Sequence, residues 1–550
     1  MPIVRHQRKI LLFVLVAFAV VWFGNLDYRK LVHPDEGRYA EIPREMLVSG
    51  NWLTPRLNGI KYFEKPPLQY WATAATFALF GEHDWTARLW SALTGFASVL
   101  LVWYTGRRLF GDAAGNYAAV VLASSALFVG IGHFNSLDMG VTLFLGAALC
   151  GFLIAQREDS TRDEERRWML FAWGAMALAT LSKGLIGAVL PLLTLIVYCI
   201  FQRDFSIWKR LHLQAGLLLY FAIAAPWFIA VSMVNPEFAG FFFIQEHFAR
   251  FATTVHQRSG PIWYFVPVLL IGLMPWIVVF LASMRRGWPR GPLPVSFSPR
   301  RFIIVYVCVV FVFFSVSGSK LISYVLPLFP GAALLGGWYL AQVRARILAW
   351  QLLPGVVVAL ALFVYVTTGA EHFRGEHTQA AMHQAYAIWL LIAMAILAFG
   401  LSYAAVCAWH DRKSRAVLVS GFTGLLCVQV IVSGYETQSP VASAHSLAIA
   451  AAPYLKAGVP IYSVQNYDQT LPFYLKHTMV LVEFQDEMDF GLKQEPQLAI
   501  SNLTEFEARW RRNPDALAMM HEDTFQLLAA RHFPMRVIAR DPRRIMVTKP

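Results

Sequence analysis

Two groups of charged residues near the start of the chain have types and spacing that could form a reaction site. The first is His33-Pro34-Asp35-Glu36-Gly37-Arg38-Tyr39-Ala40-Glu41, and the second is Tyr62-Phe63-Glu64-Lys65-Pro66-Pro67. Charges in a water-exposed loop need no special explanation, but these alternate with apolar residues at helical spacing. The Asp35-Glu36 pair also comes just after an apolar run that could cross a membrane. We therefore predict a segment on the bilayer surface whose two carboxylates face a cavity.

Asp138 is a third carboxylate at a membrane boundary. It belongs to the short connection Asn135-Ser136-Leu137-Asp138 between two apolar runs. A solvated turn residue would explain it, but a carboxylate held at this depth is costly and usually has a partner or a function. We interpret Asp138 as a functional residue.

Lys183 and Lys320 lie at the ends of apolar runs, in Ser182-Lys183-Gly184 and Ser317-Gly318-Ser319-Lys320. Neither belongs to a nucleotide-binding loop, because the GxxxxGK[ST] pattern is absent. A lysine at the membrane interface can extend its ammonium group to water, or it can bind a lipid phosphate as a point charge. Tyr324 follows Lys320 closely.

A later loop combines aromatic residues with Glu246, His247 and Arg250, which would share one helical face. An amphipathic interfacial helix with aromatic anchors accounts for this pattern. An arginine among aromatic residues is also well placed to hold an anionic lipid headgroup. A divalent ion bound by Glu246, His247, His256 and Glu64 is an alternative, although no ligand spacing requires it.

The rest of the chain must position these residues, and its composition is that of a membrane protein. Of its 550 residues, 57% are hydrophobic and only 15% charged, whereas soluble domains average about 45–50% apolar and about 25% charged residues. This excludes a soluble enzyme, a disordered chain and a disulfide-stapled secreted module. The net charge of +13 is spread over short clusters between apolar runs, which indicates membrane orientation signals rather than nucleic-acid binding.

About thirteen apolar runs of roughly 17–25 residues qualify as membrane spans. The first covers residues 10–24, and the others are centred near residues 98, 125, 147, 175, 193, 222, 273, 310, 332, 357, 396 and 425. If the N-terminus is cytoplasmic, nearly all Lys and Arg clusters between spans fall on the cytoplasmic side. An odd number of spans then places the C-terminus on the far side, which in a bacterium is the periplasm.

Three segments are predicted on that far side: a first loop at 25–87, a second at 234–262, and the tail. In the first loop, Leu68 to Gly81 is apolar but short, which predicts an interfacial helix. We expect a membrane domain at 1–433 and a soluble α/β domain at 434–550. The β-like runs of the tail are Ile461–Val464, Met479–Phe484, Met535–Ile538 and Arg544–Val547, and its helical runs are Glu505–Trp510 and Asp523–Ala530.

The Asp-Glu pair in a long first loop, followed by an Asp after the third span, resembles the GT-C glycosyltransferases that use polyprenyl-phosphate-linked sugars. This superfamily includes the protein O-mannosyltransferases. The loop is most similar to the lipid A aminoarabinose transferases. That similarity rests on Arg38-Tyr39-Ala40-Glu41-Ile42-Pro43-Arg44-Glu45-Met46-Leu47, Ser49-Gly50-Asn51-Trp52, Tyr62-Phe63-Glu64-Lys65-Pro66 and Tyr70-Trp71. It is dense over residues 27–140 and extends to residue 330, and beyond that it rests on architecture.

The resemblance implies a polytopic α-helical enzyme of the bacterial inner membrane, with its active site and C-terminal domain in the periplasm. The donor would be undecaprenyl phosphate-linked 4-amino-4-deoxy-L-arabinose and the acceptor a phosphate of lipid A. A less negative outer membrane and polymyxin resistance would follow. No cofactor is required by this reaction, and membrane lipids are the other expected partners. The oligomeric state stays open, and a monomer is compatible with the pattern.

The resemblance also assigns residues to roles. The expected catalytic residues are Asp35, Asp138 and Glu36. The expected donor- and phosphate-binding residues are Lys65, Arg250, Tyr62, Glu64, Tyr324, Lys183, Lys320 and His247. Lys65 and Arg250 would stabilise the leaving phosphate, because donors held in place beforehand best stabilise charge that develops on a leaving oxygen. A phosphate acceptor is already anionic at neutral pH, so Asp35 would orient it, or pair with the ammonium group of the sugar, rather than act as a base.

Two alternatives stay open at this level. Another GT-C transferase, such as a protein O-mannosyltransferase, would move a different sugar or use a protein hydroxyl, and would then need a carboxylate as base. A lipid transporter belongs to a different class. Transporters commonly show inverted repeats and charges near the bilayer midplane, whereas here the charges gather at one membrane face and no repeat is visible.

Overall fold

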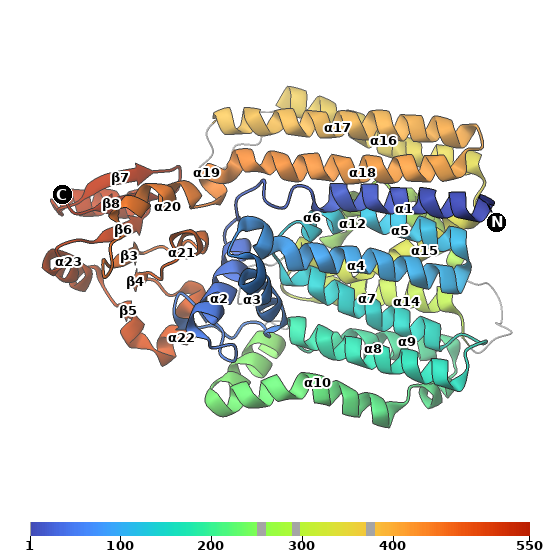
Figure 1. Ribbon diagram of the computed structural model, residues 1–550, viewed down its shortest axis with the longest axis horizontal. Coiled ribbons are helices and arrows are strands. Elements are labelled where there is room, and N and C mark those ends of the chain that lie inside the picture. Colours follow the sequence, from blue (N-terminus) through green and yellow to red (C-terminus); the bar gives the residue numbers. More distant parts are fainter. Residues whose placement is uncertain (1, 250–259, 289–296, 370–379) are drawn as a thin grey trace.

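The computed structural model describes residues 2–249, 260–288, 297–369 and 380–550. A body of long helices forms one end of the molecule and a small β-sheet with its helices forms the other (Figure 1). Between them lie α2 (Asp35–Ser49) and α3 (Leu68–Phe80). The chain begins at the end of the helical body that is furthest from the sheet, and it ends in the sheet.

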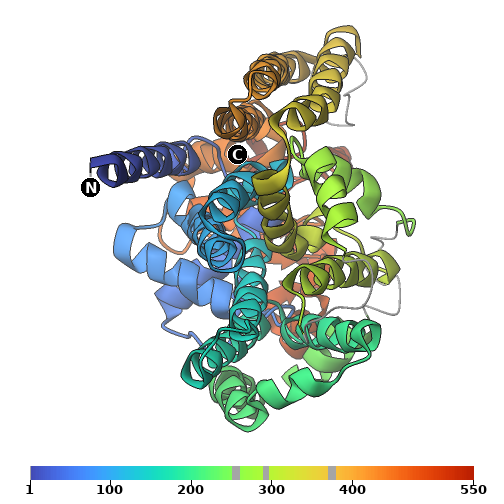
Figure 2. The same cartoon turned by 90° about the vertical axis from the view of Figure 1, so that its right-hand side faces the viewer.

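The body is made of helices that mostly run side by side along the long axis, and Figure 2 views many of them nearly end-on. They are α1 (Pro2–Phe23), α4 (Asp84–Phe110), α5 (Asp112–Ser124), α6 (Ala126–Gly132), α7 (Leu137–Ala155), α8 (Arg162–Lys183), α9 (Ile186–Gln202), α10 (Leu213–Val234), α12 (Phe265–Gly272), α13 (Ile277–Gly287), α14 (Pro299–Val316), α15 (Phe329–Gln342), α16 (Ala345–Gly369), α17 (Ala380–Trp409) and α18 (Lys413–Gly434). The predicted polytopic helical fold is therefore confirmed.

Eight helices of the described residues are long and apolar enough to cross a membrane, or up to ten if two bent pairs each form one span. The pairs are α5 with α6, bent by 63°, and α12 with α13, bent by 108°. The expectation was about thirteen spans. The remaining predicted positions are also helical, but α1 and α9 have shorter apolar stretches and α8 opens with a run of charged residues.

The segment between α1 and α4 folds over the end of the helical body. Helix α3 forms where the sequence predicted a helix at Leu68 to Gly81, and it packs against α2 and α4. A two-stranded hairpin, β1 (Arg56–Leu57) and β2 (Ile60–Lys61), joins α2 to α3. This loop is thereby held between the helical body and the C-terminal sheet.

The tail forms a six-stranded mixed sheet, so the predicted α/β fold is confirmed. The strand order is β5-β4-β3-β6-β8-β7. The strands are β3 (Ile461–Val464), β4 (Val480–Val482), β5 (Ala499–Ile500), β6 (Leu517–Met520), β7 (Arg536–Arg540) and β8 (Ile545–Thr548), and the helices beside them include α20 (His445–Ala451), α21 (Thr470–Leu475), α22 (Asp489–Gln494), α23 (Leu503–Arg512) and α24 (Glu522–Ala530). Neighbours among β5, β4, β3 and β6 are parallel, whereas β8 pairs antiparallel with β6 and β7.

The C-terminal domain is docked closely on α2. A Cβ atom at Gly37 would lie only 2.5 Å from the backbone carbonyl carbon of Gln469, so these two segments of the chain meet where only glycine fits. Arg56 of the hairpin also forms two hydrogen bonds of 2.9 Å to the carboxylate of Glu495. The first loop and the C-terminal domain therefore form one continuous surface above the helical body.

Candidate active site

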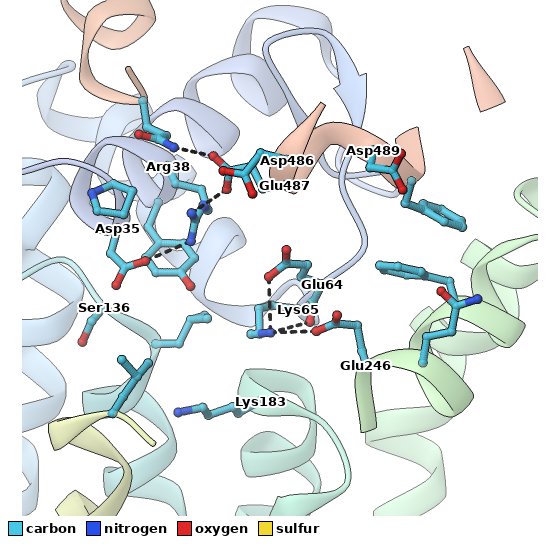
Figure 3. A pocket seen from close by; sticks show the side chains of 18 of the residues that line it. Asp35, Arg38, Glu64, Lys65, Ser136, Lys183, Glu246, Asp486, Glu487 and Asp489 are labelled. Carbon is cyan, nitrogen blue, oxygen red and sulfur yellow. Dashed lines mark hydrogen bonds and ion pairs between the residues drawn. The ribbon is translucent and has the colours of Figure 1, made fainter. Parts of the chain in front are cut away.

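A cavity of about 1020 Å³ lies where the first loop, the helical body and the C-terminal domain meet. We call it the interfacial cavity. Figure 3 shows that its charged side chains converge from all three parts. Its charged residues are Asp35, Arg38, Glu64, Lys65, Asp138, Lys183, Glu246, Asp486, Glu487, Asp489 and Lys493, and Tyr324 is one of its uncharged residues. Six predicted site residues thus line one space: Asp35, Glu64, Lys65, Asp138, Lys183 and Tyr324.

Asp138 and Lys183 form an ion pair at the side of the cavity next to the helical body. Asp138 lies in the first turn of α7, and Lys183 is the last residue of α8. A carboxylate is favoured at a helix N-terminus and an ammonium group at a C-terminus, so each helix end favours the charge it carries. The Lys183 ammonium nitrogen also lies 4.5 Å from the ring centre of Tyr324. These three residues therefore form a connected group.

Asp35 faces the cavity from the first turn of α2, with about half of its side chain (49%) exposed. Its Oδ1 accepts a 2.9 Å hydrogen bond from Arg38, one turn further along the helix. The guanidinium of Arg38 also reaches Glu487 of the C-terminal domain at 2.5 Å. Burial raises the pKa of Glu487, and the positive charge of Arg38 opposes that rise. Asp35 thus combines access to the cavity with one fixed cationic neighbour.

Lys65 lies in the middle of the cavity, between two carboxylates (Figure 3). Its ammonium nitrogen is 3.7 Å from Oε2 of Glu64 and 3.4 Å from Oε2 of Glu246. Glu246 belongs to a π-helical segment, Gly240–Ala249. The ammonium group also donates a 2.9 Å hydrogen bond to the backbone carbonyl of Glu64. It is therefore held at the cavity by a backbone acceptor and by two carboxylates, the latter at distances longer than the roughly 2.7–2.9 Å of a strong charge-assisted hydrogen bond.

Glu36 lies away from the interfacial cavity, in a buried ion cluster with Arg29 and Arg88. Its carboxylate accepts hydrogen bonds of 2.7 Å from each arginine, and also from the backbone N–H groups of Val32 and Asn135. Burial works to raise the pKa of Glu36, but the two arginines outweigh it and hold the pKa at about 2. All of its acceptor positions are used within the protein.

The buried ion cluster connects the two parts of the chain that carry the cavity carboxylates. Asp35 precedes Glu36 directly, and Asp138 follows Asn135 by three residues. Because Glu36 binds the Asn135 N–H at 3.0 Å, it ties the start of α2 to the start of α7. Glu36 is not among the residues that line the cavity, and its position is that of a residue that sets the separation of Asp35 and Asp138.

Lys320 and Tyr62 also lie outside the lining of the cavity. The Lys320 ammonium group donates to the backbone carbonyls of Ser315 and Ser317 at 2.8 and 2.9 Å. These carbonyls lie at the end of α14, where a helix leaves its last acceptors without internal partners. Tyr62 is buried behind Arg38, with the guanidinium 5.8 Å from its ring centre.

Three predicted participants cannot be placed in this geometry. Arg250 and His256 lie outside the described residues, and so does the side chain of His247. Their expected functions stay predictions. Within the residues that are described, no group of three or more His, Cys, Asp or Glu side chains is arranged to hold a metal ion.

Five charged residues of the cavity lining had no function predicted from the sequence: Arg38, Asp486, Glu487, Asp489 and Lys493. The three acids come from the C-terminal domain, more than four hundred positions after Asp35 in the sequence. They stand in a segment without a recognisable motif, so no local pattern could have indicated them. Arg38 carried a usable signal, because it follows Asp35 by one helical turn.

Comparisons with known proteins agree with this architecture. Residues 8–242 match the family model described as dolichyl-phosphate-mannose-protein mannosyltransferase, and residues 447–549 match the aminoarabinose transferase C-terminal domain. The undecaprenyl phosphate-α-4-amino-4-deoxy-L-arabinose arabinosyl transferase of Erwinia tasmaniensis is 32% identical over 422 residues, which cover 73% of this chain and 75% of that protein. The enzyme of the same name from Pectobacterium carotovorum is 35% identical over 365 residues, 64% of each chain.

The same similarity extends to solved structures. The crystal structure of ArnT from Cupriavidus metallidurans bound to undecaprenyl phosphate superposes with a TM-score of 0.93 at 36% identity, covering 98% of both chains. The apo structure of that protein superposes with a TM-score of 0.92. Helical body, first loop and C-terminal domain are thus all shared with one experimentally determined structure.

Proposed function

This chain belongs to the undecaprenyl phosphate-α-4-amino-4-deoxy-L-arabinose arabinosyl transferases, and on that premise we propose that it transfers 4-amino-4-deoxy-L-arabinose from undecaprenyl phosphate to a phosphate of lipid A. It is a glycosyltransferase of a multi-pass membrane fold, so the alternative of a lipid transporter is set aside. The observation that carries the proposal is the meeting of Asp35, Lys65, Asp138 and Lys183 in one cavity.

The proposed reaction is a displacement at the anomeric carbon of the sugar. An oxygen of the lipid A phosphate attacks this carbon and forms the new C–O bond. The bond from the anomeric carbon to the donor phosphate oxygen breaks, and its electron pair stays on undecaprenyl phosphate, which leaves. No proton needs to be removed from the acceptor, because a phosphate monoester is already anionic at neutral pH.

The cations of the cavity are suited to the two phosphates. Lys65 is the best placed to stabilise the charge that develops on the leaving undecaprenyl phosphate, because it is already held at the centre of the cavity. Lys183 can approach a second phosphate while it stays paired with Asp138. We propose, as predicted from the sequence, that Arg250 also binds the leaving phosphate. Asp35 then orients the acceptor or the sugar rather than acting as a base.

Two carboxylates of the C-terminal domain are candidates to bind the ammonium group of an amino sugar. Asp486 and Asp489 both line the cavity, and Asp489 already forms a 2.6 Å ion pair with Lys493. The ammonium group of 4-amino-4-deoxy-L-arabinose would be attracted by these carboxylates, whereas a neutral sugar such as mannose would gain no such charge interaction.

We further propose that the protein lies in the bacterial inner membrane with the interfacial cavity and the C-terminal domain in the periplasm. The distribution of Lys and Arg supports this orientation, and so does the position of the N-terminus at the opposite end of the molecule from the sheet (Figure 1). We also propose that transfer needs no cofactor. Unchanged transfer after dialysis against EDTA is expected, and a loss that added Mg²⁺, Mn²⁺ or Zn²⁺ restores would contradict it.

Mass spectrometry of lipid A tests the proposal directly. The host is a Gram-negative strain that makes the undecaprenyl donor but lacks its own aminoarabinose transferase. Expression of this protein should add the mass of aminoarabinose to lipid A and restore polymyxin resistance, whereas the Asp35→Asn variant should do neither. Unmodified lipid A despite good expression of the wild-type protein would refute the proposed acceptor or sugar.

A second candidate is a transferase that glycosylates proteins, because residues 8–242 match the mannosyltransferase family model. Its acceptor would be a neutral hydroxyl, so Asp35 would have to act as a base. Glycosylated envelope proteins together with unmodified lipid A in the same strain would favour this candidate.

A further inference from the structure

The C-terminal domain reaches the candidate catalytic carboxylate through a chain of two ion pairs. Glu487 contacts one nitrogen of Arg38 at 2.5 Å, and another nitrogen of Arg38 donates to Asp35 at 2.9 Å. In Figure 3 the Arg38 side chain lies between the two carboxylates, on the side of the cavity that the C-terminal domain covers. Of the three residues, Asp35 is the one with a widely exposed side chain.

Arg38 needs a second carboxylate to hold this position. It is 7% exposed, and a buried guanidinium is costly unless it is paired on more than one side. Its planar fork can bind two carboxylates in fixed directions, which an ammonium group cannot do. Without Glu487, the guanidinium would be free to turn fully onto Asp35 or towards solvent, and either change would move the Asp35 carboxylate.

Glu487 is itself fixed by the docking of the C-terminal domain. The side-chain amide of Gln469 donates a short hydrogen bond to Glu487. The backbone of Gln469 in turn lies against Gly37, two residues after Asp35. The position of Glu487 relative to α2 is thereby set at two points, the Gly37 contact and the Arg38 ion pair.

We propose that the C-terminal domain completes the active site, with Glu487 as a positioning residue that holds Arg38 and, through it, the carboxylate of Asp35. Glu487 sets the orientation of Arg38 and contacts neither the donor phosphate nor the acceptor. The inference rests on the proposed function, because that function makes Asp35 the carboxylate whose orientation matters. It assigns the tail a part in the reaction for which its sequence offers no motif.

The chain provides a matched control for the test. Glu495 belongs to the same domain and pairs with Arg56 of the same first loop, through two hydrogen bonds of 2.9 Å. Neither partner lines the interfacial cavity. Glu487→Gln and Glu495→Gln therefore each remove one ion pair between the C-terminal domain and the first loop, but only the first change reaches Asp35.

The experiment compares the two variants as purified full-length proteins with undecaprenyl phosphate-aminoarabinose and lipid A. For Glu487→Gln we expect kcat to fall by about 100-fold with little change in the KM for the donor, the size of effect that a misplaced catalytic group produces. Glu495→Gln should keep kcat close to wild type. Glu487→Asp keeps the charge on a shorter side chain and should retain more of kcat than Glu487→Gln. Equal losses in Glu487→Gln and Glu495→Gln, or a wild-type kcat in Glu487→Gln, would overturn the inference.

Amide hydrogen exchange provides a readout that needs no transfer reaction. Backbone amides of residues 35–41 should exchange faster in Glu487→Gln than in wild type, and at the wild-type rate in Glu495→Gln. Unchanged exchange in Glu487→Gln would overturn the inference whatever sugar the enzyme moves. A wild-type protein that transfers no aminoarabinose would refute the proposed function alone, because the exchange measurement still decides whether Glu487 holds the start of α2. Glu487→Asp, measured in parallel, decides the matter if Glu487→Gln does not fold.

Discussion

Asp35 and Glu36 are neighbours in sequence, but they belong to two regions with opposite electrostatic situations. The Glu36 carboxylate in the buried ion cluster accepts from two arginines and two backbone N–H groups. The Asp35 carboxylate in the interfacial cavity has one arginine partner, and about half of its side chain is open. A carboxylate with every acceptor position in use can only hold the protein together, whereas one with positions left over can bind a substrate.

Helix geometry explains how adjacent residues reach such different places. Successive residues of an α-helix point about 100° apart. Near its start, α2 lies between the cavity and the helical body. The Asp35 side chain therefore faces the cavity, and the Glu36 side chain faces the helical body. The two regions are nevertheless coupled, because Glu36 also binds the backbone that leads to Asp138. Mutations that separate folding from transfer would test this division.

The largest effect is expected from Glu36→Ala. This change leaves Arg29 and Arg88 as buried charges without their carboxylate, which costs about 3–5 kcal/mol. The yield of folded protein in size-exclusion chromatography should collapse, and the melting temperature of what remains should fall. A variant as stable as wild type would show that Glu36 is not the centre of this cluster.

The Asp35→Asn and Asp138→Asn variants should instead fold normally and lose transfer. Both residues line the cavity, and loss of a carboxylate that orients reacting groups typically lowers the rate by about 1000-fold. Mass spectrometry of lipid A, together with immunoblots of the membrane fraction, separates the two quantities. Near-normal lipid A modification in either variant would contradict the assignment of that residue.

A smaller effect is expected when the two kinds of lysine are compared. Lys65→Met removes the cation that stabilises the leaving phosphate, so it should lower kcat/KM for the donor by roughly 10- to 100-fold, through a lower kcat and a higher KM, the equivalent of one charge-assisted hydrogen bond. Lys320→Met removes a donor to the last carbonyls of α14, so it should lower the melting temperature and leave the donor KM unchanged. An increased donor KM in Lys320→Met would place that lysine at the donor after all.

The smallest effect concerns pH. Because the pKa of Glu36 is lowered from 4.5 to about 2 in the folded protein, its stabilising effect is complete above pH 4.5 and is lost as the pH falls towards 2. The difference in melting temperature between wild type and Glu36→Gln should therefore stay constant from about pH 8 to about pH 5, and shrink at lower pH. A difference that already shrinks near neutral pH would show that the carboxylate is more weakly paired than the structure indicates.

Much of the fold was readable from the sequence because membrane helices and exposed loops differ strongly in composition. The helical body, the helix at Leu68–Phe80 and strand β3 formed where their patterns predicted them. Strand β6 was not predicted. Its four residues, Leu517–Met520, are all buried, so they show no alternation, and none of them is β-branched. The number of spans was also harder to predict, since two pairs of helices bend sharply at positions where the apolar runs continue.

For the site, the sequence by itself determined which residue types stand at the membrane surface. Asp35, Asp138 and Lys183 were identifiable because charge next to an apolar run is costly and therefore informative, and Lys65 was assigned through the family resemblance. Only the tertiary structure decided which of these charges meet. It separated Asp35 from Glu36, assigned Lys320 to a helix end, and brought Glu487 to Arg38. The physical reason is that a carboxylate or ammonium group has the same chemistry in a cavity as in a buried pair, and its neighbours, which come from distant parts of the chain, decide what that chemistry does.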